Sequence, residues 1–482
     1  MAAPAGAGRT LNEAPGRPVR RLPLCATVKD EPAMPIRSRL TVSARFSSAF
    51  VALSLCAATA LPITALSSAA HAADGLVSDK MILLMRHGVR PQTDSKELAK
   101  LSPKAWPTWD VADGQLTAHG IQAVKALAPW QRGMLAAKGL VPAEGCPVQG
   151  TVFGWANRSV QRTIDTGKVL LTTMFPGCGL GVGYATMEGP DPLYDASETE
   201  LGAIDVDQAK EAILKAAGGS FDGLKARAAP LLKELDAILG CETGAKGCPL
   251  SAQDWQIDVK EGEGDKPASV SLKGPLAKAG TLVQVFLLQY ANGFPADQVA
   301  FGKASTAADI IRLSELRQLK YDVGNRVPYL AARDASNFLN QILIALAIDP
   351  TRDETAGGPP NAKVLLFMGS DTQQAEIAAI LGLHWHIPPY LDDETPPTGA
   401  LSFERLHDAE GKAYVRLGFT APSLDQIRTA GPIDAAHPPI QAISAVPGCE
   451  AETVEGACPL ETFLTLSRPK LDMTAVAPYA YE

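Results

Sequence analysis

The chain has 482 residues, of which 46% are apolar and 20% are charged, and its formal net charge is −8 at pH 7. This composition is typical of a globular protein and excludes a disordered or collagen-like chain. The length exceeds that at which single cores stop growing, so we expect one large unit with an inserted second one. The acidic balance argues against nucleic acid as a partner, and an anionic substrate would need a local cationic pocket.

The first 72 residues differ from the rest of the chain and are interpreted as a leader. Residues 1–33 are rich in Ala, Pro, Gly and Arg and show no periodicity, so translation could start at Met1 or at Met34. Removing the leader would take away 8 Lys+Arg and 3 Asp+Glu, which leaves 36 against 49 and a formal charge near −13.

The leader has the pattern of a secretory signal. A basic segment precedes an apolar run over Phe50–Leu61, and Ala70-His71-Ala72 forms an Ala-x-Ala cleavage site. This pattern predicts cleavage before Ala73 and export to a bacterial periplasm. A membrane anchor is the alternative, but Pro62 leaves the apolar run too short to span a bilayer.

Cysteine usage agrees with export. Two of the eight cysteines lie in the leader, and the even number that remains indicates disulfide bonds in an oxidising compartment. Close spacing suggests Cys241–Cys248 and Cys449–Cys458, which leaves Cys146–Cys178. Six cysteines allow about 15 connectivities, however, and spacing does not decide among them. Metal binding is the alternative, without a Cys-x-x-Cys motif or a histidine cluster to support it.

After the leader, the run Met81-Ile82-Leu83-Leu84-Met85 predicts a short buried strand of a parallel sheet covered on both faces. Gly88 ends the run, so Arg86, His87 and Arg90 lie where the strand passes into a loop, and ligand sites of α/β sheets form at such carboxyl ends. Arginines neutralise phosphoryl oxygens and an imidazole can attack phosphorus. Taken alone, the tripeptide Arg-His-Gly still favours a surface loop with scattered charges.

A second junction of the same kind follows. The pattern predicts, in order, a loop over Pro91–Pro107, a helix over 121–135, a strand over 151–155 and a helix ending at Met174. Arg162 lies near the start of the last helix, after a strand, as His87 does. Alone, Arg162 would be interpreted as the partner of a surface carboxylate such as Asp165.

From about residue 203 to 348 the character changes to long helical patterns broken by a polar segment at 260–267, which predicts a mainly helical insertion. These helical patterns cover 208–217, 223–239, 282–291 and 335–347.

A third junction follows the insertion. Residues 363–368 predict another buried strand, and Ser370 and Asp371 come directly before a helix over 374–381. Asp371 could be a site residue, or an acidic residue of the first helical turn that the helix dipole favours. Residues 413–420 predict a later strand.

With these three junctions in place, the sequence resembles the histidine acid phosphatases, in the periplasmic branch that contains bacterial phytases and glucose-1-phosphatases. The resemblance covers nearly the whole chain after the leader, and the six cysteines fall where that branch has its bridges. It rests on motifs in order: Arg86–Arg90, Leu116-Thr117-x-x-Gly120, Arg162-Thr163-x-x-Thr166-Gly167, Phe286-Leu287-Leu288-Gln289, Gly369-x-Asp371-Thr372, Thr395-Pro396-Pro397-x-Gly399 and Phe403-Glu404-Arg405.

The resemblance implies an α/β fold like that of phosphoglycerate mutase, with a parallel-dominated sheet and helices on both faces. Residues 73–202 and 351–482 would form this α/β domain. Residues 203–350 would form a mainly α-helical cap domain that covers the cleft and sets specificity.

The resemblance also implies the roles of the site residues. His87 would attack phosphorus and become a phosphohistidine, which splits one hard displacement into two easier ones. Arg86, Arg90 and Arg162 would clamp the phosphoryl oxygens in place of a metal, so that no cofactor is expected. Asp371 would protonate the leaving alcohol and then activate water.

The sequence departs from the family at Ser370, where a histidine is usual, and serine keeps a hydroxyl donor but loses the ring and its charge. Losing one donor costs roughly 10²- to 10³-fold in rate. Ser370-x-x-Gln373 also has the form of a helix-capping box. Thr93 matches a substrate-contacting threonine of the phytase branch, but Asp94 stands where a lysine is usual and would repel a polyanion such as inositol hexakisphosphate.

The sequence therefore predicts a phosphomonoesterase that acts on a small phosphate ester, phytate-like or sugar phosphate, as a monomer without nucleic acid or membrane partners. The alternative is a weakened homologue that binds phosphate or a sugar phosphate, which Ser370 favours. Because His87 and Asp371 are both present, and binding alone would need neither, the enzyme is the preferred interpretation.

Overall fold

The structure, a computed structural model, describes residues 75–241, 248–264, 266–352 and 357–481. The predicted leader and its cleavage site lie outside these residues. No helix in the described part of the chain is both long and apolar enough to cross a membrane.

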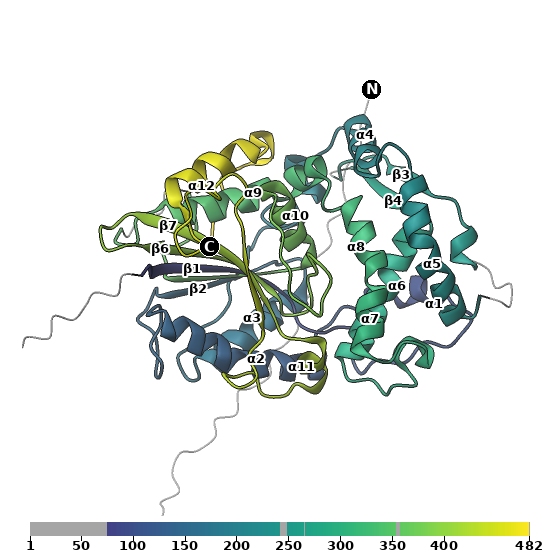
Figure 1. Cartoon of the computed structure of the whole chain (residues 1–482), viewed down its shortest axis with the longest axis horizontal. Coiled ribbons are helices and arrows are strands. Elements are labelled where there is room, and N and C mark those ends of the chain that lie inside the picture. Colours follow the sequence, from purple (N-terminus) through teal and green to yellow (C-terminus); the bar gives the residue numbers. More distant parts are fainter. Residues whose placement is uncertain (1–74, 242–247, 265, 353–356, 482) are drawn as a thin grey trace, which may run out of the picture. The chain divides into compact units, whose positions relative to one another are not determined.

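A central sheet carries its strands in the order β2-β5-β1-β6-β7-β8, with β9 paired to β7 (Figure 1). Strand β1 pairs in parallel with β5, and β5 with β2, whereas β6 to β9 extend the sheet in antiparallel fashion. The predicted α/β class is thus confirmed, with an antiparallel edge added to the parallel part. The bounds are β1 Val77–Arg86, β2 Val152–Ala156, β5 Val364–Gly369, β6 Ala400–His407, β7 Ala413–Ala421, β8 Ile440–Ser444 and β9 Cys458–Pro459.

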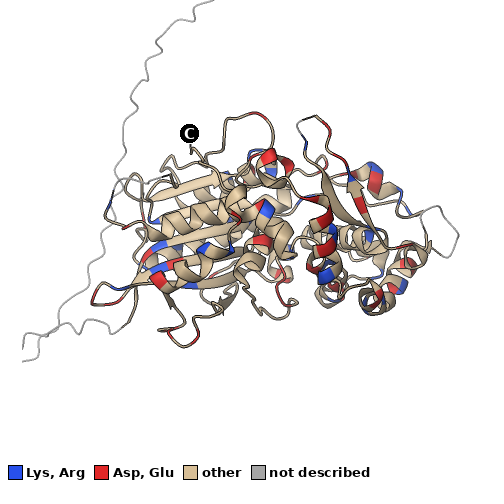
Figure 2. Ribbon diagram, turned by 90° about the horizontal axis from the view of Figure 1, so that it is seen from above, with Lys and Arg blue, Asp and Glu red and all other residues tan. Residues whose placement is uncertain are grey.

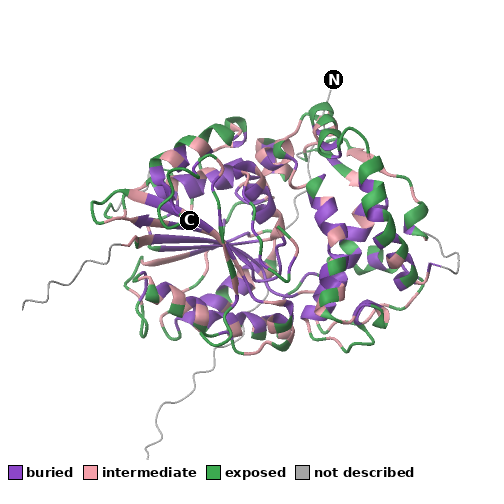
Figure 3. Ribbon diagram, viewed as in Figure 1, coloured by how far each residue is buried: buried purple, intermediate pink, exposed green. Residues whose placement is uncertain are grey.

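Helices cover both faces of the parallel strands, as predicted. Strand β1 alternates between two cores: Leu83 and Met85 belong to one cluster with residues of α2 and α3, while Ile82 and Leu84 belong to another with residues of α9 and α10. Each apolar side chain buried in this way contributes about 1.5–3 kcal/mol. Figure 3 shows the strands as the most continuously buried elements. These helices are α2 Ala118–Ala137, α3 Gln161–Met174, α9 Pro328–Ala347 and α10 Asp371–Leu381, and α12 Leu460–Ser467 packs on β7.

The segment between α3 and β5 is mainly helical, as the periodicity predicted, and its polar interruption connects two strands, β3 and β4, that pair with each other. Its elements are α4 Val206–Ala216, α5 Asp222–Leu239, β3 Gln256–Lys260, β4 Ser269–Lys273, α6 Pro275–Ala291, α7 Ala307–Leu313 and α8 Glu315–Asp322. Helix α9 follows these in sequence, but its Phe338 packs against Phe367 of β5, with ring centroids 5.1 Å apart, so it belongs to the layer on the sheet.

Two helices begin earlier than predicted, and one expected loop contains a helix. Helix α6 begins at Pro275 rather than near residue 282, and α9 at Pro328 rather than near 335, because proline suits the first helical position and its missing N–H costs nothing there. The expected loop over Pro91–Pro107 contains a short helix, α1 (Ser95–Ala99), whose N-cap is Asp94. Another short helix, α11 (Leu424–Thr429), follows β7.

The three disulfides have the pairing that spacing suggested. Cys241–Cys248 and Cys449–Cys458 close short loops, and Cys146–Cys178 joins the segments that follow α2 and α3. Figure 2 shows that charged residues gather mostly on helices and loops.

Candidate active site

The three predicted junctions meet at one edge of the sheet. Arg86, the last residue of β1, pairs with Gly369, the last residue of β5. His87 and Asp371, which follow these strand ends, therefore lie at the same edge of the sheet. The backbone N–H of His87 donates to the Gly369 carbonyl at 3.2 Å, and that of Asn157, directly after β2, donates to the Met368 carbonyl at 3.0 Å. The parallel register therefore brings together residues that are far apart in the sequence.

The imidazole of His87 is fully buried and held in one tautomer. Its Nδ1 lies 2.8 Å from the Gly88 carbonyl, which can only accept, so Nδ1 carries the hydrogen. Nε2 is buried and has no hydrogen-bond partner among the described residues. Burial, reinforced by the three surrounding guanidiniums, lowers the pKa of His87 well below its ordinary value. Nε2 thus presents a free lone pair at neutral and mildly acid pH.

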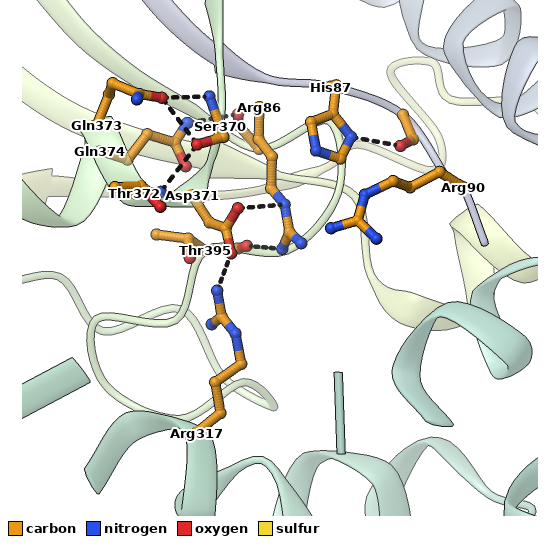
Figure 4. A network of polar contacts seen from close by, with 12 residues as sticks. Arg86, His87, Arg90, Arg317, Ser370, Asp371, Thr372, Gln373, Gln374 and Thr395 are labelled. Carbon is orange, nitrogen blue, oxygen red and sulfur yellow. Dashed lines mark hydrogen bonds and ion pairs between the residues drawn. The ribbon is translucent and has the colours of Figure 1, made fainter. Parts of the chain in front are cut away.

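Three arginines surround this nitrogen, and Figure 4 shows the Arg86 and Arg90 guanidiniums on the same side of the His87 ring. Arg90 donates from Nη1 to the Pro91 carbonyl at 2.7 Å, and Arg162 donates to the Gly114 carbonyl at 3.4 Å. Burial lowers the pKa of Arg90 to about 9 and that of Arg162 to about 10, so both stay charged in acid and neutral solution.

The guanidiniums keep unused donors. Arg86 donates from Nη1 to the Thr395 carbonyl, but its Nη2 is buried without a partner in the described structure. The Nε atoms of Arg90 and Arg162 are likewise buried without a hydrogen-bond partner in the described structure. Buried donors normally have partners, so three positive groups with spare N–H groups around a free imidazole nitrogen indicate a site that binds an anion.

Asp371, the first residue of α10, points toward the same space. Its Oδ1 lies 3.4 Å from Nε of Arg86. Its Oδ2 contacts the guanidinium of Arg317 and accepts a hydrogen bond from the Tyr321 hydroxyl at 2.8 Å. Burial alone would raise the pKa of Asp371, but the arginines outweigh it and hold that pKa well below its ordinary value.

The sequence analysis missed Arg317 and Tyr321, which come from α8. Within the polar stretch Glu315–Asp322 they look like ordinary residues of a solvated helix. The signal that could have found them is the buried face of that helix, where Leu316 and Leu319 flank Arg317.

Ser370 forms the predicted capping box with Gln373. Its hydroxyl accepts from the Thr372 N–H at 3.2 Å and lies 2.8 Å from Oε1 of Gln373. The hydroxyl is therefore occupied by the start of α10, although the residue itself lies beside the arginine cluster.

Thr93 and Asp94 lie at the exposed rim. Thr93 sits beside Gly114, the residue whose carbonyl Arg162 contacts. The Asp94 carboxylate accepts from the backbone N–H groups of Lys96 and Glu97, each at 2.9 Å. Its charge is thus turned toward the start of α1.

A polar cavity of about 310 Å³ adjoins Arg162 and Ser370. Besides these two residues and Asn157, its polar lining includes Asn325 and three carboxylates, Asp195, Glu198 and Asp334. Burial raises the pKa of Asp195 to about 7 and also raises that of Asp334. The space next to Arg162 is therefore lined by carboxyl groups, and Asp195 carries its charge only above about pH 7.

The Arg162–Asp165 pair proposed as an alternative is not formed, since Asp165 accepts from Gln161 instead, at 2.9 Å. The structure thus brings His87, Asp371 and the three predicted arginines together, and it adds Arg317.

Comparison with known proteins agrees with this geometry. Residues 79–420 match the model of the histidine phosphatase superfamily (branch 2). The chain is 29% identical to phytase AppA of Escherichia coli over 410 residues, which cover 84% of this chain and 94% of that protein. It is 30% identical to the glucose-1-phosphatase of Salmonella typhimurium over 415 residues, or 83% of this chain and 94% of that one.

Among solved structures, the Hafnia alvei phytase in complex with tartrate superposes with a TM-score of 0.76 at 30% identity, covering 84% of this chain and 99% of that one. The family match and the coverage on both sides show that the chain belongs to the histidine phosphatase superfamily, branch 2, as a phosphoric monoester hydrolase of the histidine acid phosphatase kind.

Proposed function

We propose that the protein hydrolyses phosphate monoesters through a covalent phosphohistidine at Nε2 of His87. The observation that carries this proposal is the free, buried Nε2 of a neutral imidazole, surrounded by three arginines with unused donors. The Nδ1–H bond to the Gly88 carbonyl keeps the lone pair on Nε2 and fixes the ring.

In the first step Nε2 attacks phosphorus, an N–P bond forms and the ester P–O bond breaks. Arg86, Arg90 and Arg162 neutralise the three equatorial oxygens, and Asp371 gives its proton to the departing alkoxide. In the second step Asp371, now a carboxylate, takes a proton from a water that attacks phosphorus. The N–P bond then breaks, and the products are an alcohol and inorganic phosphate.

The first experiment compares the mature chain with His87→Ala on a chromogenic monoester at mildly acid pH. Loss of the nucleophile should lower kcat by at least 10³-fold, and rapid acid-free quenching of the wild type with labelled substrate should trap an acid-labile phosphoprotein. His386→Ala is the matched control, because that side chain is 73% exposed. Equal rates in wild type and His87→Ala would favour the phosphate-binding alternative.

For the substrate, we propose a monoester whose alcohol part is neutral and rich in hydroxyls, such as a sugar phosphate, rather than a polyphosphate. Support comes from the acidic cavity beside Arg162, since carboxylates accept hydrogen bonds from hydroxyls and repel further phosphates. At acid pH Asp195 is protonated and the repulsion is weaker.

This substrate preference has its own measurement. The ratio of kcat/KM for glucose 1-phosphate to that for inositol hexakisphosphate should exceed one and should rise as the pH passes about 7. Asp195→Asn should reduce this rise, whereas Asp207→Asn, at a carboxylate 92% exposed, should leave it unchanged. A ratio below one across the pH range would contradict the preference and leave the phosphatase proposal intact.

We also propose that the helical segment 203–350, apart from α9 on the sheet, acts as a cap on the site, and that the chain is exported to the periplasm after cleavage before Ala73. The cap proposal is supported by Arg317 and Asn325, which this segment brings to the site and its cavity. The export proposal is supported by the three disulfides, which persist in oxidising compartments. N-terminal sequencing of the exported protein would test the cleavage site.

A further inference from the structure

Asp371 is held by a residue outside the predicted set. Arg317 is only 4% exposed and contacts Oδ2 of Asp371. Its guanidinium also donates to the Tyr321 hydroxyl at 2.8 Å and lies 4.2 Å from the centre of the Tyr321 ring. Figure 4 shows Arg317 reaching Asp371 from a helix on the side away from His87. Both oxygens of Asp371 are therefore taken.

This arrangement bears directly on the two-step reaction. Asp371 must carry a proton when the alkoxide leaves, and it must be a carboxylate when water attacks. Two guanidiniums favour the carboxylate at both stages. A bound phosphoryl group would compete with Asp371 for Arg86, because Arg86 is needed to neutralise the phosphoryl oxygens. Arg317 approaches from the cap side and stays in contact with Oδ2 of Asp371.

Among the described residues, Asp371 forms ion pairs with Arg86 and Arg317, and Arg317 is not one of the predicted phosphate ligands. The buried carboxyl group of Glu394 lies near both Arg86 and Arg317 and acts electrostatically on them. The ionisable groups around Asp371 are Arg86, His87, Arg90, Arg162, Arg317, Lys320 and Tyr321.

We propose that Arg317 is a positioning residue that orients the carboxyl group of Asp371 and sets the pH range in which Asp371 can serve as the proton donor. The proposal rests on the proposed function. It follows that hydrolysis of esters with poor leaving groups is confined to more acid pH than hydrolysis of esters with good ones, because only the former need a proton from Asp371.

The test uses two monoesters: glycerol 2-phosphate, whose alkoxide must be protonated, and p-nitrophenyl phosphate, whose phenolate leaves without help. In Arg317→Met the descending limb of kcat/KM for glycerol 2-phosphate should move to higher pH by about one to three units, since one opposite charge near Asp371 is lost. The limb for p-nitrophenyl phosphate should stay in place. Arg317→Lys, which keeps the charge, should resemble the wild type.

The ratio of the two kcat/KM values at each pH does not depend on the fraction of folded enzyme, so partial unfolding of Arg317→Met does not hide the result. An unchanged ratio profile in Arg317→Met, or the same shift for both esters, would overturn the proposal for Arg317. Should Arg317→Met fail to fold, Arg317→Gln is compared with Tyr321→Phe instead. Arg317→Gln removes the positive charge beside Asp371, whereas Tyr321→Phe removes only one neutral hydrogen-bond donor. Failure of the proposed function is separate, because it would appear as equal activity in wild type and His87→Ala.

Discussion

At the scale of single residues, Ser370 shows how a position can serve the fold and the site at once. Its hydroxyl caps α10, the helix on which Asp371 is the first residue. The capping box thus fixes the backbone that aims the carboxylate. A substitution here acts first on the helix start and only then on the chemistry.

We expect Ser370→Ala to lower the free energy of unfolding by about 0.5–2 kcal/mol, the usual cost of losing an N-cap. Because the hydroxyl is occupied by Thr372 and Gln373, kcat should fall by less than about tenfold, below the loss expected for a phosphate donor. Urea unfolding and steady-state kinetics measure the two effects. Ser370→Thr keeps the cap and is the control; a loss of 10²-fold or more in Ser370→Ala with normal stability would instead make Ser370 a phosphate ligand.

At the scale of elements, the loop that carries His87 and Arg90 follows strand β1 and packs against the start of helix α2. Gly120 of α2 lies against the loop that carries Arg90: a Cβ there would stand 2.5 Å from the Val89 carbonyl oxygen. Gly133, in the same helix, has nothing within 4 Å of such a Cβ. Gly120 therefore faces closely packed backbone, whereas Gly133 faces open space.

Gly120→Ala should destabilise the protein by about 1–3 kcal/mol, as overpacking does, and should lower kcat/KM because the loop with Arg90 must shift. Gly133→Ala should leave activity unchanged and raise stability by up to about 1 kcal/mol, since alanine is the better helix former. Thermal unfolding and kinetics on both variants provide the check. Equal effects at the two positions would mean that the close approach to Val89 does not matter.

Elements with strong periodicity were predicted from the sequence, and elements fixed by tertiary contacts were not. We could predict the strands β1, β2 and β5, and the helices that follow them, because each buries an apolar face that shows as a pattern in the sequence. Helix α1 is too short to show a period, and its only local signal is the capping carboxylate of Asp94. The contact of Arg317 with Asp371 spans 54 residues and depends on how the helical segment meets the strand ends, which no local pattern encodes.

At the scale of the whole molecule, buried carboxyl groups link stability to pH. Burial raises the pKa of Asp195 to about 7, and it also raises the pKa values of Asp334 and Glu376. A raised folded pKa means that the folded state binds more protons than the unfolded state between the two pKa values. The stability that these three groups contribute is therefore fully present below their unfolded pKa values and is lost as the pH rises toward 7.

His87 acts in the opposite sense, because its lowered pKa lets the unfolded state bind a proton below about pH 6.5 where the folded state does not. The effect of the three carboxyl groups on stability is opposite to that of His87 and involves more protons. We therefore expect the free energy of unfolding to fall between pH 5 and pH 7.

Asp195→Asn should flatten this fall by up to about 1.4 kcal/mol per pH unit, the contribution of one proton. Denaturant unfolding of wild type and variant at pH 5, 6 and 7 measures the difference. Asp207→Asn, on an exposed carboxylate, serves as the control and should keep the slope of the wild type. A slope unchanged in Asp195→Asn would place the linked proton elsewhere.

The arginine cluster has a consequence for how the enzyme would behave once substrate has been consumed. On the proposed function, its unused donors would bind the oxygens of a phosphoryl group and would not contact the alcohol to which that group is bound. Inorganic phosphate, the second product, offers those oxygens in full and lacks only the part that would enter the acidic cavity. On the proposed mechanism, inorganic phosphate is therefore a competitive inhibitor. Abundant free phosphate occupies the same arginines and slows the hydrolysis of esters, and turnover resumes as phosphate is depleted.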